Sequence, residues 1–425
     1  MQMIRQPLEN RDGKLYFDGI FTGKLAKEFD TPLYVISEKR IKENYNQLHK
    51  VLIANYGKIR IYYAAKANSN LAVLRIMENM GAYLDVVSPG EVFLALKSGF
   101  TPERILFTGT SVRNDELEFL AKSNVTLNVD SLSQLERLLK LKVPQFLSIR
   151  VNPEVGAGHH DHVVTAGKHS KFGLWEADAV KAYEIAKDAG VERFGMQMHV
   201  GSGVLDAKPY VQALEKLLNV AKKVSEKLGL KFEYVDIGGG LGVPYKPEDK
   251  ELDLTSFSEE ILSFFKSKIE EYDLGEPIFC VEPGRYLITD AVVLLTTVNT
   301  IKTTPFKKFI GVDAGFNTLL RPAMYGSYHH ILVANKLNSP DQDLYDVVGP
   351  ICESGDALAK DRRLPNMQEG DLLAVLNAGA YGFSMSSQYN ARPRAAEVIT
   401  KNGRAYLVRE REQFEDLVKT QRMAE

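Results

Sequence analysis

The sequence predicts an α/β protein, in which a (β/α)8 TIM-type barrel is joined to a mostly antiparallel β-sandwich or β-barrel domain. From about residue 30, short apolar runs alternate with longer amphipathic stretches, a pattern that favours a parallel sheet covered by helices. The alternating unit occurs eight times before residue 285, which suits a barrel of roughly 250 residues. Beyond residue 285, strand-like runs follow one another with few helical stretches between them.

The eight expected barrel strands are short, apolar and rich in β-branched and aromatic residues. They cover residues 59–65, 82–88, 104–109, 125–130, 145–152, 194–200, 234–240 and 277–283. Amphipathic helices are expected between them, among others at 70–81, 90–100, 131–141, 211–229 and 257–272. In the 211–229 segment, apolar residues recur at near-helical spacing between lysines and glutamates, at Leu214, Leu217, Leu218 and Val220.

The second domain is expected to use both ends of the chain. Its strand-like runs are 14–21, 291–303, 309–315, 345–351, 371–379, 395–400 and 404–410. We therefore predict that residues 1–30 form an N-terminal segment joining the β domain, that 31–275 form the barrel, and that 276–425 form the C-terminal β domain.

Composition limits the classes of protein. With 44% hydrophobic and 25% charged residues, the chain has the make-up of a soluble globular protein, and a net charge of −2 gives no support for a nucleic-acid partner. Two cysteines, Cys280 and Cys352, exclude a disulfide framework and favour a reducing, cytoplasmic setting. The N-terminus lacks the apolar core of a signal peptide, and no apolar run approaches the roughly 20 residues of a membrane span.

Polar side chains and one run of glycines stand where several of the expected barrel strands end. The polar residues are Lys66 after the first strand, Asp85 in the second, His199 at the end of the sixth, and Glu282 with Arg285 after the eighth; the glycines are Gly238–Gly240, after the seventh. The carboxyl ends of all eight strands of such a barrel lie on one face, where active sites are built. We therefore expect these residues to converge.

Each of these residues has a chemical and a purely structural interpretation. A lysine at the rim of an apolar barrel can have its pKa lowered by desolvation and form a Schiff base; alternatively, Lys66 extends to solvent. The glycines of DIGGGLGVPY (236–245) can bring backbone N–H groups to a phosphate, or simply form a tight turn. They are not a dinucleotide fingerprint, because Val243 stands where that motif needs glycine.

The remaining strand-end residues suit the same ligand. In HVGSG (199–203), Ser202 can bind phosphate and His199 offers a flat ring for stacking, although a satisfied core histidine is the commoner case. Glu282 can keep a pyridine nitrogen protonated, or form an ordinary ion pair. A lysine, a phosphate loop, a flat ring and a carboxylate on one face are what pyridoxal phosphate requires of a protein.

The chain resembles the fold type III, alanine-racemase-like decarboxylases that use pyridoxal 5′-phosphate, and within them the diaminopimelate decarboxylases. The resemblance extends over essentially the whole chain. It is carried by the motifs YAAKAN (63–68), DVVSPGE (85–91), SKFG (170–173), HVGSG, DIGGGLG, EPGR (282–285), RPAMYGSYH (321–329), GPICESGD (349–356) and GAYGFSMSSQYN (379–390).

The resemblance implies roles for individual residues. Lys66, His199 and Cys352 are implied in catalysis, Lys66 as the Schiff-base lysine and Cys352 as the proton donor. Cofactor binding is implied for Lys66, Asp85, His199, Ser202, Gly238, Gly239, Gly240, Glu282, Gly284, Arg285 and Tyr381. Substrate binding is implied for Arg285, Arg321, Tyr325, Glu353 and Tyr381. In the family the cysteine comes from a partner subunit, so a homodimer with shared active sites is expected.

The implied reaction is decarboxylation of the small amino acid meso-2,6-diaminopimelate to L-lysine, the last step of lysine biosynthesis. Arginines suit the carboxylate at the far end of this substrate and Glu353 its ammonium group, whereas a lone distal ammonium would be repelled by arginine. A lysine or ornithine decarboxylase remains the alternative, and a non-catalytic homologue that binds pyridoxal phosphate is a third interpretation.

The segment GHHDH (158–162) invites a metal interpretation through its three histidines, His159, His160 and His162. No further ligands stand at convincing spacing, so we expect no metal site and interpret the segment as a mobile polar loop over the active site.

Overall fold

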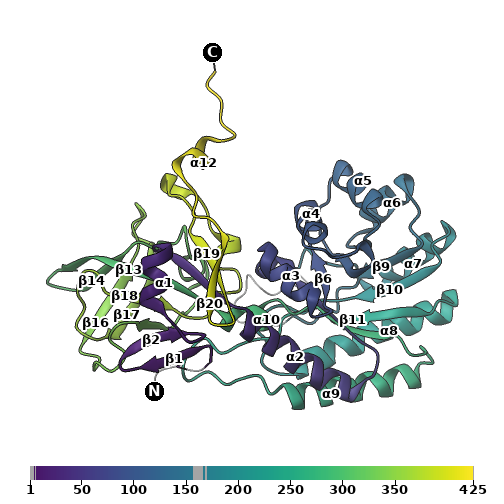
Figure 1. Cartoon of the computed structure of the whole chain (residues 1–425). Coiled ribbons are helices and arrows are strands. Elements are labelled where there is room, and N and C mark those ends of the chain that lie inside the picture. Colours follow the sequence, from purple (N-terminus) through teal and green to yellow (C-terminus); the bar gives the residue numbers. More distant parts are fainter. Residues whose placement is uncertain (1–3, 5, 157–165, 168–169, 425) are drawn as a thin grey trace. The chain divides into compact units, whose positions relative to one another are not determined.

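Eight parallel strands close into a barrel, which confirms the predicted fold class (Figure 1). The computed structural model describes residues 4, 6–156, 166–167 and 170–424. Each barrel strand pairs with its neighbours in chain order, and the last strand closes on the first. In order they are β5 (Ile59–Ala64), β6 (Tyr83–Val86), β7 (Ile105–Phe107), β8 (Thr126–Val129), β9 (Phe146–Arg150), β10 (Arg193–Gln197), β11 (Phe232–Asp236) and β12 (Ile278–Val281).

Helices connect the barrel strands as the amphipathic pattern predicts. They are α3 (Leu71–Asn79), α4 (Pro89–Lys97), α5 (Asn114–Ser123), α6 (Leu132–Leu141), α7 (Glu176–Asp188), α8 (Lys208–Leu228) and α9 (Leu254–Glu271). The predicted apolar face of α8 is buried. Four of these helices begin at a side chain that accepts a backbone N–H of the first turn, namely Asn70, Ser88, Ser131 and Asp253. Such caps stabilise a helix start by about 1 kcal/mol.

The turn-prone residues after Lys66 end strand β5 sharply. The Asn68 side chain accepts the N–H of Asn70 at 3.0 Å, and the Asn70 side chain accepts the N–H of Ala72 at 2.9 Å. The Tyr63 hydroxyl donates to the carbonyl of Asn68 at 2.9 Å. These bonds fold the chain directly from strand into helix, and they leave Lys66 at the carboxyl end of the strand.

The second unit is a mostly antiparallel β domain built around the long strand β13 (Val292–Thr303), as predicted. This strand pairs with β4 (Leu33–Ser37), β14 (Lys308–Val312) and β18 (Leu372–Val375). The sheet also contains β15 (Ile331–Val333), β16 (Asp343–Val348), β17 (Ala357–Leu364), β19 (Ala396–Lys401) and β20 (Arg404–Arg409). Its core includes Phe17, Leu33, Val35, Val293, Leu295, Ala374 and Val398.

Smaller elements complete the chain. A three-stranded sheet near the N-terminus comprises β1 (Leu8–Arg11), β2 (Lys14–Phe17) and β3 (Ile20–Phe21). The remaining α-helices are α1 (Thr22–Phe29), α2 (Glu38–Asn55), α10 (Arg285–Ile288), α11 (Arg321–Tyr325) and α12 (Phe414–Val418). Short 3-10 helices are η1 (Ala65–Ala67), η2 (Pro102–Arg104), η4 (Thr289–Ala291), η5 (Phe383–Met385) and η6 (Tyr389–Ala391).

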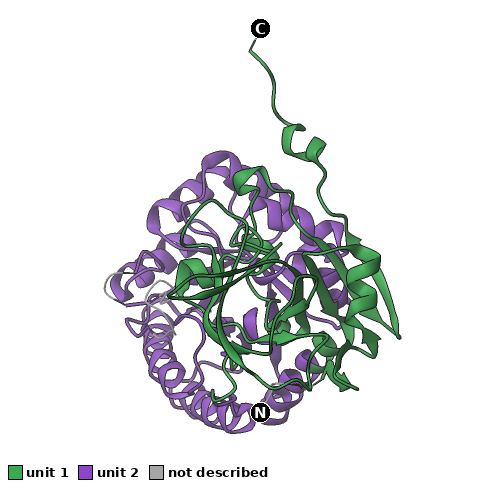
Figure 2. Ribbon diagram, turned by 90° about the vertical axis from the view of Figure 1, so that its left-hand side faces the viewer, with its two compact units in different colours: residues 1–43, 244–249, 287–425 green, residues 44–243, 250–286 purple. Residues whose placement is uncertain are grey.

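The boundaries between the two units lie later in the chain than the sequence predicts. The β-rich unit comprises residues 1–43, 244–249 and 287–425, and the barrel unit comprises 44–243 and 250–286 (Figure 2). The predicted boundaries were 30/31 and 275/276. The first moves because β4 pairs with β13 and β19 in the β-rich sheet, and the second moves because β12 is a barrel strand.

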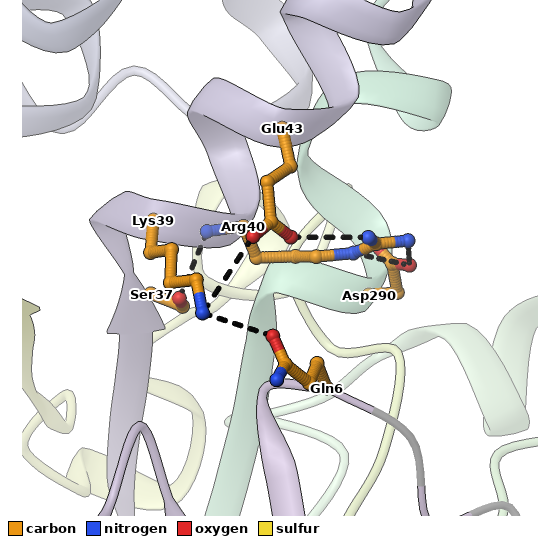
Figure 3. Close-up of polar contacts among 6 residues, drawn as sticks. All are labelled: Gln6, Ser37, Lys39, Arg40, Glu43 and Asp290. Atoms are coloured by element: carbon orange, nitrogen blue, oxygen red, sulfur yellow. Dashed lines mark hydrogen bonds and ion pairs between the residues drawn. The ribbon is translucent and has the colours of Figure 1, made fainter.

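Side chains at the start of α2 hold this segment to the β-rich unit (Figure 3). The Arg40 guanidinium donates to Asp290 at 2.8 and 3.1 Å and to Glu43 at 3.3 Å. Lys39 donates to Gln6 at 2.9 Å, so the N-terminal segment joins the same group.

Among the described residues, no helix combines the length and apolar character needed to cross a bilayer.

The glycines of the GPICESGD motif allow a specific test of packing in the β-rich unit. A Cβ at Gly349 would overlap the Cα of Gly315 and the carboxylate of Asp356. Gly349→Ala should therefore lower the free energy of unfolding by about 1–3 kcal/mol. In the control Gly355→Ala, nothing lies within 4 Å of the added Cβ, so stability should change by less than about 0.5 kcal/mol. Equal melting temperatures for the two variants would contradict the close approach.

Candidate active site

Lys66 lies in η1, immediately after β5, and forms an ion pair with Asp85 of β6. The Lys66 side chain is 30% exposed, whereas the Asp85 side chain is fully buried. The second oxygen of Asp85 accepts a hydrogen bond from the Thr108 hydroxyl at 2.6 Å. Because Thr108 holds one oxygen of the buried Asp85 carboxylate, the other oxygen has a fixed direction. Asp85 therefore fixes the Lys66 ammonium at the accessible end of the barrel.

Two further carboxyl groups are buried beside this pair. Asp236, at the end of β11, is fully buried, and Glu282, after β12, is 2% exposed. Burial raises the pKa of Asp236 to about 7; the charge of Asp85 adds to this and the N–H of Gly238 opposes it. Burial, with the charges of Asp236 and Asp85, also raises the pKa of Glu282 well above its usual range. A cationic or N–H-bearing ligand group is favoured here, because it would stabilise the ionised form of these buried carboxyl groups.

A chain of amides crosses the barrel to Glu282. The Gln197 side chain, at the end of β10, donates to both oxygens of Glu282, at 3.1 and 3.2 Å. Its own carbonyl accepts from the Asn128 side chain of β8 at 3.2 Å. All three side chains are buried, and the amide N–H bonds stabilise the ionised form of Glu282 and fix its orientation.

Arg150, at the end of β9, supplies positive charge to the same end of the barrel. It is 6% exposed, and burial lowers its pKa against the opposing charges of Asp130, Glu282, Asp85 and Asp236. Its guanidinium lies 4.6 Å from the ring centroid of Phe172, in the SKFG motif. The motif thus packs against the buried charges of the barrel.

His199 is positioned as a neutral ring. Its Nδ1 accepts the N–H of Gly201 at 3.0 Å. Burial of the imidazole, with the positive charges of Arg150 and Lys66, lowers the pKa of His199 well below its usual range. The ring therefore carries its proton on Nε2 and stays uncharged at neutral pH, which suits stacking on a flat ligand.

The glycine-rich turns meet backbone to backbone. Gly238 and Gly240 have positive φ angles of 73° and 102°, which glycine adopts without cost. A Cβ at Gly239 would overlap the carbonyl of Glu282, and one at Gly240 would overlap that of Gly201. The three glycines are therefore needed for the turns after β10, β11 and β12 to approach one another.

A buried arginine completes this corner. Arg285, 4% exposed, donates to the Ser202 hydroxyl from two guanidinium nitrogens, at 3.2 and 3.1 Å. A guanidinium beside a hydroxyl and a glycine-rich turn is suited to a phosphate dianion. Gly284 lies next to Arg285, and a Cβ there would meet the side chains of Ala64 and Ala67 at 3.1 and 3.0 Å. Gly284 thus lets the EPGR segment pack on both sides of Lys66.

The other predicted residues belong to the β-rich unit. Arg321 begins α11, is 2% exposed, and lies with its guanidinium 5.2 Å from the ring centroid of Tyr245. Tyr325 ends the same helix. Cys352 and Glu353 lie in an exposed loop after β16. Tyr381 has a left-handed φ of 59°.

The structure brings together the ten predicted residues of the barrel unit, and it adds residues that the sequence analysis missed. Thr108, Arg150, Gln197 and Asp236 all contact or lie among the predicted groups. All four stand inside predicted strands, where polar residues that alternate with apolar ones are the available signal. The three histidines at 159, 160 and 162 lie outside the described residues. In the part of the chain that the structure describes, no three or more His, Cys, Asp or Glu side chains are placed so that they could hold a metal ion.

Comparison with known proteins identifies relatives over the whole chain. The pyridoxal-binding domain of the pyridoxal-dependent decarboxylases matches residues 38–289. Diaminopimelate decarboxylase of Methanothermobacter thermautotrophicus is 54% identical over 415 residues, covering 97% of this chain and 96% of the relative. The crystal structure of diaminopimelate decarboxylase from M. jannaschii with L-lysine has a TM-score of 0.91 and 34% identity, and covers 99% of each chain. A lysine/ornithine decarboxylase from Vibrio vulnificus shares the fold, with a TM-score of 0.77, 22% identity, and 89% and 97% of the two chains covered.

Asp236→Asn should flatten the pH dependence of stability of the cofactor-free protein. The folded carboxyl keeps its proton up to about pH 7, whereas in the unfolded chain its pKa is near 3.8. The folded state binds more protons in this window, so the free energy of unfolding of the wild type falls as pH rises through it. Denaturant unfolding at several pH values measures the slope. An equally steep fall in the variant would contradict the raised pKa.

Proposed function

This chain belongs to the diaminopimelate decarboxylases of the pyridoxal-dependent decarboxylase family, and on that premise we propose that it converts meso-2,6-diaminopimelate to L-lysine and carbon dioxide. The observation that carries the proposal is the 54% identity to a diaminopimelate decarboxylase over 97% of the chain. The M. jannaschii relative was crystallised with L-lysine, which has the chemistry of the expected product. The reaction would then be the last step of lysine biosynthesis.

Pyridoxal 5′-phosphate fits the residues at the carboxyl end of the barrel. The buried Arg285 beside Ser202, and the glycine turn whose backbone admits no Cβ, suit the phosphate. The buried carboxylate of Glu282 suits the protonated ring nitrogen, the neutral ring of His199 suits the face of the pyridine, and Lys66 supplies the amine that holds the aldehyde. When bound, this group accepts the electron pair released as the bond to the substrate carboxylate breaks.

The chain's own groups divide the remaining work. Gln197 and the buried surroundings keep Glu282 directed into the barrel. Asp85 holds the Lys66 amine at the accessible end. Cys352, whose thiol is exposed, returns a proton to the α-carbon once carbon dioxide has left. By its family, the chain contributes Cys352 to the site of a second subunit, so the working enzyme is a homodimer.

Recognition of the far end of the substrate is assigned to the other arginines and to Glu353. Arg285 and Arg321, with the hydroxyl of Tyr325, bind the distal carboxylate, and Glu353 binds the distal ammonium, with Tyr381 near the cofactor. Because Arg321 is buried, a substrate that brings no carboxylate to it should bind less tightly. The two cysteines, both free, suit the reducing cytoplasm as the working compartment.

Carbon dioxide release across a panel of amino acids tests the function. The panel is meso-diaminopimelate, lysine, ornithine and arginine, each with added pyridoxal phosphate. A buried charge left without its partner costs about 2–5 kcal/mol, so the specificity constant for meso-diaminopimelate should exceed that for lysine by roughly thirtyfold or more. Comparable release from lysine or ornithine would favour the alternative decarboxylases. No release from any substrate would favour a non-catalytic homologue.

Lys66 should carry the cofactor covalently. Borohydride treatment of the holoenzyme followed by peptide mapping should find the pyridoxyl group on Lys66, because its amine is the one directed from a barrel strand end by a buried carboxylate. Lys66→Arg is the matched control, since it keeps a positive charge opposite Asp85 but offers no amine. A pyridoxyl group on another lysine of the wild type would reject the site.

A further inference from the structure

Two neighbouring residues of η6 form hydrogen bonds with the loop that carries Cys352 and Glu353. The side-chain carbonyl of Asn390 accepts the backbone N–H of Cys352 at 2.8 Å. The hydroxyl of Tyr389 donates to the carboxylate of Glu353. The turn and the loop are more than 30 residues apart in the sequence, so both bonds are tertiary contacts.

The turn itself is held in an uncommon backbone conformation. Asn390 and Ala391 have consecutive left-handed φ angles of 57° and 54°. Asparagine tolerates this region, whereas alanine is strained there. Such strain persists only where the surroundings impose it. The Tyr389 ring stacks on Phe316, with 5.6 Å between centroids and 17° between planes.

The base of the same loop is fixed from the other side. The buried carboxylate of Asp356 accepts the N–H of Ile351 and the N–H of Phe316, each at 2.7 Å. Phe316 therefore links the two ends of the arrangement, because its backbone contacts Asp356 and its ring contacts Tyr389. The residues between, from Cys352 to Gly355, are exposed, so packing does little to orient them.

We propose that Tyr389 and Asn390 are positioning residues for the decarboxylase reaction: Asn390 sets the direction of Cys352, and Tyr389 sets that of Glu353. This inference rests on the proposed function, in which Cys352 returns the proton and Glu353 binds the distal ammonium. The hydrogen bond to Glu353 also raises the pKa of Tyr389, so its hydroxyl stays a donor throughout the working range. Loss of each contact then affects a different kinetic constant.

Substitutions at Tyr389 and Asn390 should change different kinetic constants. Tyr389→Phe keeps the ring on Phe316 and removes only the donor, so KM for meso-diaminopimelate should rise roughly tenfold, the cost of a hydrogen bond to a charged group, while kcat stays within about twofold. Asn390→Gly keeps the left-handed turn and removes the acceptor, so kcat should fall roughly tenfold with little change in KM. Asn390→Asp, which retains an acceptor oxygen, should restore kcat.

A readout without substrate tests the contact to Cys352 directly. Cys280 is fully buried and Cys352 is exposed, so the rate of alkylation by iodoacetamide in the holoenzyme reports on Cys352. Asn390→Gly should change this rate by roughly threefold or more, because the loop loses one of its anchors. Asn390→Asp should keep the wild-type rate. Tyr406→Phe, which removes an equally exposed hydroxyl on β20, is the control and should change neither the kinetics nor the alkylation rate.

The outcomes separate this inference from the proposed function. The inference would be overturned if Tyr389→Phe and Asn390→Gly both kept the wild-type kcat, KM and alkylation rate. It would also be overturned if both variants showed the same fall in kcat and the same rise in KM. Cys352→Ala and Glu353→Gln test the underlying roles: if they leave kcat and KM unchanged, the proposed roles of these two residues fail. The alkylation rates decide the positioning of Cys352 in either case.

Discussion

The burial of three carboxyl groups at one end of a closed barrel is the constraint on which the rest of the site depends. Asp85, Asp236 and Glu282 are nearly inaccessible to solvent, and leaving such charges unpaired would cost several kcal/mol each. The chain offsets this cost with Lys66 and Arg150, with the amide of Gln197, and with the N–H of Gly238. The raised pKa values of Asp236 and Glu282 show that this compensation is incomplete. This face therefore favours a ligand that brings an N–H or a positive charge.

The same constraint explains the local structure around Lys66. Its amine has to meet a fully buried Asp85, so strand β5 must end abruptly and the next helix must start at once. Asn68 and Asn70 achieve this by accepting backbone N–H groups in place of further strand pairing. Gly284 then allows the EPGR segment to approach Ala64 and Ala67 on either side of the lysine. The turn-prone residues after Lys66 are therefore part of the same arrangement as the buried carboxyl groups.

Much of this could be predicted from the sequence because the barrel is periodic. Alternating apolar and amphipathic stretches predict all eight strands to within a few residues. The common face of strand ends assembles eight of the ten candidate residues of the barrel unit, whereas Ser202 comes from the HVGSG turn and Gly284 from the family resemblance. Arg150 and Gln197 were missed because other polar residues stand in the same predicted strands, such as Ser148 and His199, and the groups that they interact with come from other parts of the chain. The first unit boundary is predicted too early because 33–37 reads like any buried strand, whereas its neighbours β13 and β19 lie more than 250 residues away.

The two units hold their functional residues by different physical means. In the barrel, buried side chains are fixed by the cost of leaving any polar atom without a partner, so strand position alone indicates where they point. In the β-rich unit, Cys352 and Glu353 are exposed and gain no such constraint from burial. Their orientation has to come from specific contacts, which Asp356, Tyr389 and Asn390 supply at the expense of a strained turn. Contacts of this kind leave no periodic trace in a sequence. The family motifs therefore contain Asp356, Tyr389 and Asn390 without indicating which residues they contact.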